Sequence, residues 1–261
     1  MLSEFFYLYQ NKKTSCFLPG TTLNQVLGDY YFNDTLSTLI FEAIRSIEIS
    51  IRTVIANICS VSLGSFCHQD RKNYPNLSTQ RYNRLYKDLR SAYERNKKQY
   101  SYTEHFAKKY GDKHEIPPFW IMIELISFGN LYPLFIGVEN KIQADIVAIY
   151  QIPIKVFENW LKALRNIRNA CAHHDRIWNI HVKPILIPRK NKYPLWHQNI
   201  EVPNDKIFTV LTIIYYLLGI IDKGKQKFWK KKLFLLLQED NEVHSVSMGF
   251  VNGWKDSRLW S

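Results

Sequence analysis

The sequence predicts an all-α protein, with residues 1–261 forming a single domain that carries inserted loops. Apolar residues recur at steps of three and four through most long segments, which is the period of an α-helix. No alternating strand pattern persists beyond short runs such as Ile185–Ile187. Proline, glycine and capping residues stand at the ends of the helical stretches, where helices usually begin and stop. A helical core with irregular connections therefore explains the pattern best.

The composition fits a folded protein with an acidic partner. Of the 261 residues, 46% are apolar and 22% are charged, which excludes a disordered tail. Four cysteines form no CxxC pair, which argues against a zinc ribbon or a disulfide framework and favours a reducing, cytoplasmic location. The net charge of +12 favours nucleic acid as partner. Surplus lysine in chains from A/T-rich genomes is the alternative explanation.

The first long helix is expected to start at Asn33, with Asn33 or Asp34 as its cap. Charged residues such as Glu48 and Arg52 lie on another face than the apolar residues. The apolar positions follow helical spacing: Leu36, Leu39, Ile40, Ala43, Ile44, Ile47, Ile51, Val54, Ile55 and Ile58.

Residues 71–113 form a basic, tyrosine-rich region with 12 Lys/Arg against four Asp/Glu. Cations attract phosphate and tyrosine rings can stack on unpaired bases, so this region could contact RNA. The alternative is a solvated helix, about residues 78–98, with its tyrosines packed inward. We predict that seven cations bind RNA: Arg81, Arg84, Lys87, Arg90, Arg95, Lys97 and Lys98.

Further helices follow. Pro117-Pro118 interrupts the chain, and the next helical segment is expected to end at Gly129. The pattern then predicts helices over 141–150 and from Ile154 to about His173. A proline-rich loop separates the last of these from an apolar helix that ends at Ile221.

The apolar helix, Ile207–Ile221, has about 15 residues, fewer than the roughly 20 that a membrane span needs. A buried core helix, capped by Asn204 or Asp205, is therefore the better interpretation, and no membrane partner is expected. The final helix is basic, with six lysines between Lys223 and Lys232.

Common catalytic motifs are absent: no GxxxxGK[ST], GxGxxG, GxSxG or HExxH occurs, and the eight histidines show no ordinary metal spacing. We therefore expect neither a metal nor a cofactor. One polar constellation remains, LRNIRNACAHHDRIWN, at the end of the helix and loop over 154–179. Arg165, Asn169 and His173 are spaced one turn apart on one face, and Arg168 can bend toward them.

This set suits RNA cleavage by 2′-OH attack on the adjacent phosphate, which needs no metal. Histidine transfers protons near neutral pH, arginine grips two phosphate oxygens, and asparagine orients without charge. The alternative is structural, because His–His near a helix end can cap carbonyls and Arg–Asp pairs can tie loops.

Arg168-Asn169-x-x-x-His173 resembles the R-N-x-x-x-H signature of HEPN ribonucleases. The wider string RNxCAHHxRxWN resembles the Abi-like abortive-infection family (AbiD/AbiF type) of bacterial phage-defence proteins. Three further blocks resemble that family in the same order: IRSIEISIRTVI with Glu48 and Arg52, PPFWIMIELISFG, and SMGFVNGWKDSRLW. The family's usual first helical segment, before Phe5–Tyr9, is not found, so the N-terminus is expected to be shortened.

The resemblance implies a HEPN-type helical bundle with additional helices and loops, usually a homodimer with one composite site from two motifs. It also implies, for some members, restraint by a small non-coding RNA in a toxin–antitoxin-like arrangement. We predict an endoribonuclease with Arg168, Asn169 and His173 as catalytic residues. Supporting roles are expected for Arg165, His174, Arg176, Asn179, Glu48, Arg52 and Glu124.

Among these, we expect His174 to bond the following loop and Trp178 to be core. A non-catalytic protein that holds a structured RNA is the first alternative function. A protein-interaction or nucleotidyl-transfer module, with Arg168 on ATP, is the second, although no phosphate loop supports it.

Overall fold

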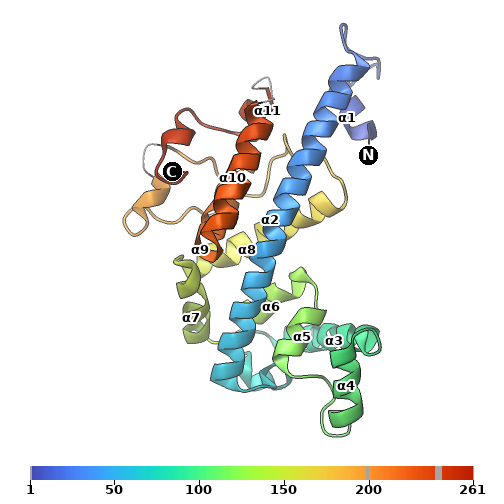
Figure 1. The fold of residues 1–261 in the computed structure, drawn as a ribbon, viewed down its shortest axis with the longest axis vertical. Helices are drawn as coiled ribbons and strands as arrows, with labels where there is room; N and C mark the ends of the chain where they lie inside the picture. Colours follow the sequence, from blue (N-terminus) through green and yellow to red (C-terminus); the bar gives the residue numbers. More distant parts are fainter. Residues whose placement is uncertain (1, 198–199, 239–242, 261) are drawn as a thin grey trace. The chain divides into compact units, whose positions relative to one another are not determined.

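The computed structural model describes residues 2–197, 200–238 and 243–260 (Figure 1). This part of the chain is all-α, as predicted, with no strand and one isolated bridge between Gln10 and Phe17. The helices are α1 (Leu2–Leu8), α2 (Leu23–Leu63), α3 (Thr79–Asn96), α4 (Ser101–Tyr110), α5 (Phe119–Leu125), α6 (Phe128–Gly137), α7 (Asn140–Tyr150), α8 (Ile154–Ala172), α9 (Ile207–Ile221), α10 (Lys223–Gln238) and α11 (Val243–Met248).

The chain divides into two compact units. The first comprises Met1–Ile47 and Lys162–Ser261, and the second comprises Glu48–Leu161. Helices α2 and α8 each pass from one unit into the other. That residues 1–261 form one domain stays a prediction, and the two units are described separately.

In the first unit, α9 is the central core helix, which confirms its interpretation as buried. Every residue from Ile207 to Tyr215 is buried. The Trp260 ring stacks on Tyr215 with centroids 4.7 Å apart, and the Trp229 indole N–H donates to the Leu39 carbonyl at 3.0 Å. The expected caps are wrong, because the helix begins at Ile207 with Lys206 at its cap position. The Asp205 carboxylate instead accepts from His181 Nδ1 at 2.8 Å.

Helix α2 begins ten residues earlier than predicted, so the expected start at Asn33 is wrong. The start is a capping box formed by Thr22 and Gln25. Thr22 N–H donates to Gln25 Oε1 at 2.9 Å, and Gln25 N–H donates to Thr22 Oγ1 at 3.3 Å. These bonds satisfy backbone groups that a helix start leaves without partners. Asn33 therefore lies inside the helix, and its side chain is available for a tertiary contact.

By length and composition alone, α2 could cross a membrane, but the core helix of a soluble protein passes the same test. One face of α2 is buried, with Leu36, Ile40, Ile44, Ile51 and Ile55 each at most 1% exposed. That pattern is typical of a core helix.

In the second unit, the predicted end at Gly129 is wrong. The helix breaks at Ile126 and Ser127, which are both extended, and Gly129 lies in the first turn of α6. The guanidinium of Arg52 caps this helix end. Its Nη2 donates to the Ile126 carbonyl at 2.9 Å, and its Nη1 donates to the Ile123 carbonyl. An arginine can thus satisfy the last carbonyls of a helix and end it without glycine.

The predicted helices that correspond to α3, α7 and α8 are confirmed within one or two residues. Helix α3 begins after Ser78, whose hydroxyl accepts from the Arg81 N–H at 3.3 Å. Helices α7 and α8 match the predicted ranges, and α10 extends the expected basic helix to Gln238. The short helices α1, α4 and α11 were not predicted; each has ten residues or fewer, so its pattern covers at most three turns.

Candidate active site at the end of helix α8

Helix α8 carries the predicted motif in its last turn. Its apolar face buries Phe157, Trp160, Leu164 and Ile167, each at most 3% exposed. The polar face and the C-terminal end of the helix therefore remain for the motif residues. This distribution is that of an amphipathic helix packed on one side.

The helix ends in a Schellman motif at His174. His174 N–H donates to the Cys171 carbonyl at 3.1 Å, and Asp175 N–H donates to the Ala170 carbonyl at 2.9 Å. His174 itself is left-handed, with φ of 56°, a conformation that glycine usually supplies at this position. Its ring is exposed and has no hydrogen bond to a described residue, so its backbone, rather than its imidazole, organises the loop.

His173 lies one residue before this turn, and its side chain points into an open environment. Its backbone N–H donates to the Asn169 carbonyl at 2.9 Å, which continues the helical bonding. The imidazole is exposed, and within the described part of the chain it forms no hydrogen bond or ion pair. The ring can therefore accept a proton from a ligand, or donate one to it, without first breaking a hydrogen bond to a described residue.

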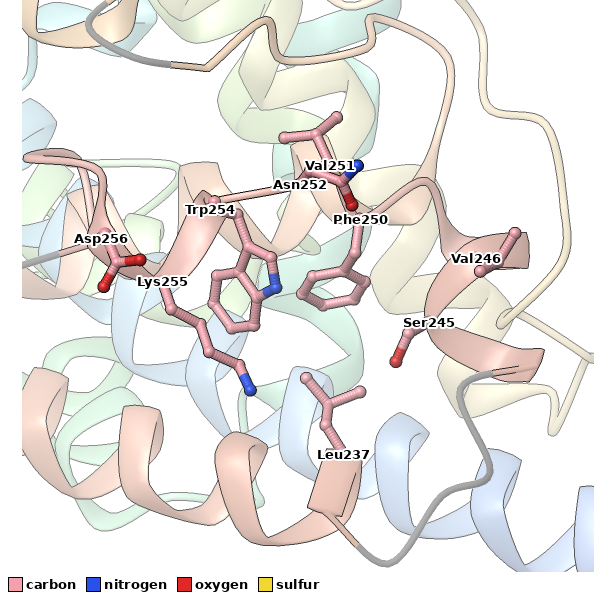
Figure 2. A pocket seen from close by; sticks show the side chains of 10 residues that line it. Leu237, Ser245, Val246, Phe250, Val251, Asn252, Trp254, Lys255 and Asp256 are labelled. Atoms are coloured by element: carbon pink, nitrogen blue, oxygen red, sulfur yellow. The ribbon is translucent and has the colours of Figure 1, made fainter.

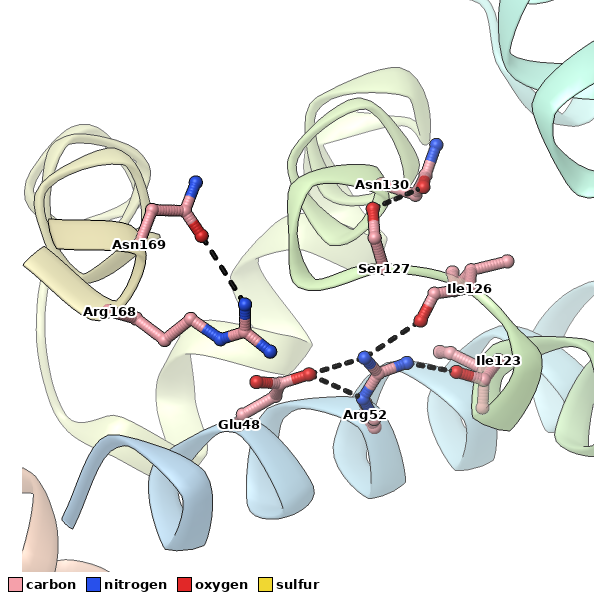
Figure 3. A network of polar contacts seen from close by, with 8 residues as sticks. All are labelled: Glu48, Arg52, Ile123, Ile126, Ser127, Asn130, Arg168 and Asn169. Atoms are coloured by element: carbon pink, nitrogen blue, oxygen red, sulfur yellow. Dashed lines mark hydrogen bonds and ion pairs between the residues drawn. The ribbon is translucent and has the colours of Figure 1, made fainter. Parts of the chain in front are cut away.

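Arg168 is half-buried and is held on the same helix. Its guanidinium lies over the Phe41 ring, 5.5 Å from the centroid, and its Nη1 donates to Asn169 Oδ1 at 3.4 Å (Figure 3). Arg165 makes a similar local bond to Asn166 Oδ1 at 3.2 Å. The structure thus brings Arg168 and Asn169 together, whereas no hydrogen bond joins Arg168 to His173 within the described chain.

The loop after the motif is clamped by Asn33, which sequence reasoning had placed at a helix start. Its Nδ2 donates to the Asp175 carbonyl at 3.2 Å, and its Oδ1 accepts from the Ile177 N–H at 2.8 Å. Asn33 is 4% exposed; its bond to Ile177 is buried, and its bond to the exposed Asp175 is partly buried. No sequence signal reveals this contact, because the partners are more than 140 residues apart.

A partly buried chain of hydrogen bonds joins Tyr9, Asp29 and His244, and His244 contacts Trp178 of the loop. Trp178 is core, as predicted, and its ring meets that of His244 edge-on at 4.4 Å. His244 Nε2 donates to Asp29 Oδ1 at 2.9 Å, and the Tyr9 hydroxyl donates to Asp29 Oδ2 at 3.0 Å. Burial, followed by the bond to Asp29, raises the pKa of Tyr9 to about 12. Sequence reasoning missed Tyr9, Asp29 and His244.

Arg176 and Asn179, two of the predicted supporting residues, belong to the loop. Arg176 donates from its backbone N–H to Glu4 Oε2 at 3.5 Å and from Nη1 to the Glu4 carbonyl at 3.3 Å. Asn179 Oδ1 is buried and has no hydrogen-bond partner among the described residues. Both residues are half-buried, which suits a role in fixing the loop.

Glu48, Arg52 and Glu124 lie in the second unit. Arg52 is 8% exposed and donates from Nε to Glu48 Oε1 at 3.1 Å, while its Nη groups reach the carbonyls that end α5 (Figure 3). Glu124 is exposed on α5 and has no hydrogen bond to a described residue. Glu48 and Arg52 therefore form a structural pair inside their own unit, and their predicted support of the motif stays a prediction.

The seven cations predicted to bind RNA lie on or just after α3. All are exposed except Lys97, which is half-buried. Arg90 pairs with Glu115 at 2.8 Å, and Lys97 approaches Glu94 at 3.9 Å. The other five have no carboxylate partner in the described parts of the chain: Arg81, Arg84, Lys87, Arg95 and Lys98.

Six of the seven tyrosines of this region divide into two groups. Tyr82 and Tyr93 on α3 are buried, together with Tyr74, as the packing alternative predicted. Tyr100, Tyr102 and Tyr110 are about 40% exposed, and the rings of Tyr100 and Tyr102 stack with centroids 5.3 Å apart. The seventh, Tyr86, is half-buried and donates to Glu115 Oε2 at 2.6 Å. The second group therefore offers the most exposed ring faces to a base.

Among the residues that the structure describes, no group of three or more His, Cys, Asp or Glu side chains could hold a metal ion. The four cysteines are free thiols. Burial raises the pKa of the Cys171 thiol, on the buried face of α8, to about 12, so this thiol is protonated near neutral pH and is a poor nucleophile.

Comparison with family models and known proteins identifies one family for this chain. No curated protein and no solved structure matches the chain. Residues 1–179 match the family model described as Abi-like protein. The matched range includes α8, His173 and the loop to Asn179, and it covers more than half of the 261 residues. The chain therefore belongs to the Abi-like family, which is associated with abortive infection, the defence of bacteria against phages.

Proposed function

We propose that this protein is a metal-independent HEPN-type endoribonuclease of phage defence, with Arg168, Asn169 and His173 as its catalytic residues. The observation that carries the proposal is the His173 imidazole, exposed at the end of α8 with no internal hydrogen bond in the described chain. Family membership supports the defence role.

The chemistry follows from the side chains. A neutral imidazole takes the proton of the RNA 2′-OH, the oxygen attacks the adjacent phosphorus, and the bond to the 5′-oxygen breaks. A protonated imidazole supplies the proton for that leaving oxygen. The products are a 2′,3′-cyclic phosphate and a 5′-OH. A guanidinium such as that of Arg168 would stabilise the charged phosphorane.

One chain supplies one His173, whereas the reaction needs a proton acceptor and a proton donor. A homodimer with two facing motifs would provide both imidazoles. In that arrangement Arg168 would leave Asn169 for the phosphate, a small change because the bond between them is long at 3.4 Å. We include the homodimer and the cytoplasmic location in the proposal.

RNA would be held by the exposed cations on and just after α3, five of which form no ion pair with a carboxylate among the described residues. Phosphate contacts of this kind hold RNA without reading its sequence. The same surface suits a small non-coding RNA that restrains the enzyme, in a toxin–antitoxin arrangement.

The test is to incubate the purified protein with cellular RNA in EDTA. We expect discrete fragments that end in 2′,3′-cyclic phosphate, since no step needs a metal. Intact RNA under conditions where the protein binds it would contradict the proposal.

A second candidate is a non-catalytic RNA-binding defence protein. It is favoured by one observation: among the described residues, Arg168 bonds Asn169 and lies over the Phe41 ring, and no hydrogen bond joins it to His173. Tight, salt-sensitive binding of intact RNA in the same EDTA assay would support this candidate.

A further inference from the structure

A cavity of about 360 Å³ lies in the first unit, between the end of α10, helix α11 and the segment that follows it (Figure 2). This volume is typical of pockets for small molecules. None of the motif residues of α8 lines the cavity, so it is separate from the proposed active site. It lies in the C-terminal block SMGFVNGWKDSRLW, to which the proposed function assigns no role.

Two aromatic rings form its wall. Phe250 and Trp254 have centroids 4.8 Å apart with planes at 58°. Trp254 is 8% exposed and is fixed by edge contacts to Phe234 at 5.1 Å and to Trp260 at 5.0 Å. The wall is therefore preformed by the core, and it suits a flat aromatic ligand.

Four polar residues line the same cavity: Ser245, Asn252, Lys255 and Asp256. In Figure 2 Asp256 and Ser245 lie on either side of the Trp254 and Phe250 rings. None of the four polar residues has a side-chain hydrogen bond or ion pair with another described residue. Lys255 lies 5.8 Å from the Trp254 ring centroid, so its charge is next to the aromatic wall. A ligand that combines an aromatic ring, an anion and hydroxyl groups would satisfy all four.

We propose that this pocket binds a ribonucleotide. The base would lie against Phe250 and Trp254, the phosphate would pair with Lys255, and Asp256 would accept hydrogen bonds from ribose hydroxyls. Asn252 both donates and accepts, so it can bond a base edge. The ribonucleotide could be a free mononucleotide or the terminal, unpaired nucleotide of an RNA strand. The inference does not depend on cleavage by the α8 motif.

The test is isothermal titration of the full chain with the four ribonucleoside 5′-monophosphates and with the corresponding nucleosides. At least one monophosphate should bind, and its nucleoside should bind about tenfold more weakly, as expected for loss of one charge-assisted contact. Lys255→Gln should weaken the monophosphate to a similar extent. Lys231→Gln is the matched control, since Lys231 is exposed on α10 and does not line the cavity.

Because Trp254 is part of the core, Phe250→Leu is the safer test of the aromatic wall, with the melting temperature as a check of folding. A uridine octamer with a 5′-phosphate separates the two sources. If only the octamer binds, and Lys255→Gln weakens that binding, the ligand of the pocket is an RNA end. If only a monophosphate binds, the ligand is a free nucleotide.

No binding of any monophosphate or of the octamer at millimolar concentration would overturn the proposal. Equal weakening by Lys255→Gln and Lys231→Gln would overturn it as well, because that result indicates general charge attraction. Retained, Lys255-dependent binding in a protein that cleaves no RNA would refute the endonuclease and leave the pocket standing.

Discussion

The side chain of Asn33 accepts a buried 2.8 Å hydrogen bond from the backbone of Ile177, 144 residues away in the sequence. The same amide donates to the Asp175 carbonyl at 3.2 Å. One side chain thus satisfies two backbone groups of the loop that follows His173. Removing it would leave an N–H and a carbonyl without this partner in a shielded site.

Asn33→Ala should therefore lower the free energy of unfolding by about 1–3 kcal/mol, the cost of leaving buried polar groups unsatisfied. Urea denaturation measures the change. Asp34→Ala is the control, because Asp34 is exposed on the same helix and should change stability by less than about 0.5 kcal/mol. Equal effects of the two variants would contradict a clamp at Asn33.

His174→Gly should stabilise the protein. The left-handed conformation, with φ of 56°, costs a non-glycine residue about 1–2 kcal/mol, and glycine adds about 0.5–1 kcal/mol of unfolded-state entropy, which leaves a net gain of about 0.5–1 kcal/mol. The midpoint of urea unfolding should rise accordingly.

His173→Gly is the comparison, because His173 does not have a positive φ and a glycine there can only weaken the helix end. A loss of stability in His174→Gly would show that the imidazole, and not the backbone, stabilises this turn.

Sequence periodicity was sufficient for the long helices and for the burial of α9, because a long amphipathic or apolar stretch has few alternatives. It failed at helix ends. The start of α2 does have a sequence signal, the capping box Thr22-x-x-Gln25, which lies ten residues before the predicted start. The end of α5 was not visible, since its cap is the guanidinium of Arg52, 71 residues before Ile123.

In the candidate site too, the sequence predicts the local motif but not the contacts made by residues far apart in the chain. The motif predicts His173 and Arg168 as a pair, but the local environment of Arg168 depends on Phe41, which comes from α2. His174 stands where glycine is usual, so the sequence predicts the approximate end of α8 but not the left-handed turn that forms it. Contacts such as that between Asp29 and His244, 215 residues apart, arise only from tertiary packing.

His173→Ala should reduce RNA cleavage in EDTA by at least about a hundredfold, the usual contribution of a proton-transfer group. The rate of cyclic-phosphate formation measures this, and growth arrest in cells should be lost in parallel. His105→Ala is the control, because His105 is exposed on α4 and lies outside the motif. Cleavage at the same rate in His173→Ala and His105→Ala would remove His173 from the mechanism.

The double variant Arg84→Ala/Lys87→Ala should weaken RNA binding and reduce its salt dependence. Both cations are exposed and have no carboxylate partner in the described chain. If each contacts a phosphate of single-stranded RNA, the slope of log K against log salt should fall by about 1.4. Lys141→Ala, an exposed position on α7, should leave the slope unchanged. An unchanged slope in the double variant would place the RNA elsewhere.

The second unit should lose stability in mild acid because of His68. Its side chain is 1% exposed and packs on the Phe119 ring at 5.3 Å. Burial lowers the pKa of His68 from 6.5 to about 4, an effect that the Pro117 carbonyl only partly offsets. In the unfolded chain the ring takes up a proton below pH 6.5, whereas in the folded chain it stays neutral until about pH 4. Protonation of His68 therefore does not affect the free energy of unfolding above pH 6.5. As the pH falls from 6.5 toward 4, the free energy of unfolding decreases by on the order of 3 kcal/mol.

Urea denaturation at pH 7.5, 6, 5 and 4 should follow this loss in the wild-type protein. In His68→Phe the same series should decline much less, since phenylalanine cannot bind the proton and keeps an aromatic ring against Phe119. His105→Gln should keep the wild-type decline, because His105 is exposed. If His68→Phe is itself too unstable to measure, His68→Leu offers a smaller apolar side chain for the same comparison. A decline of equal size in the wild type and in a folded His68 variant would mean that other groups cause the acid sensitivity.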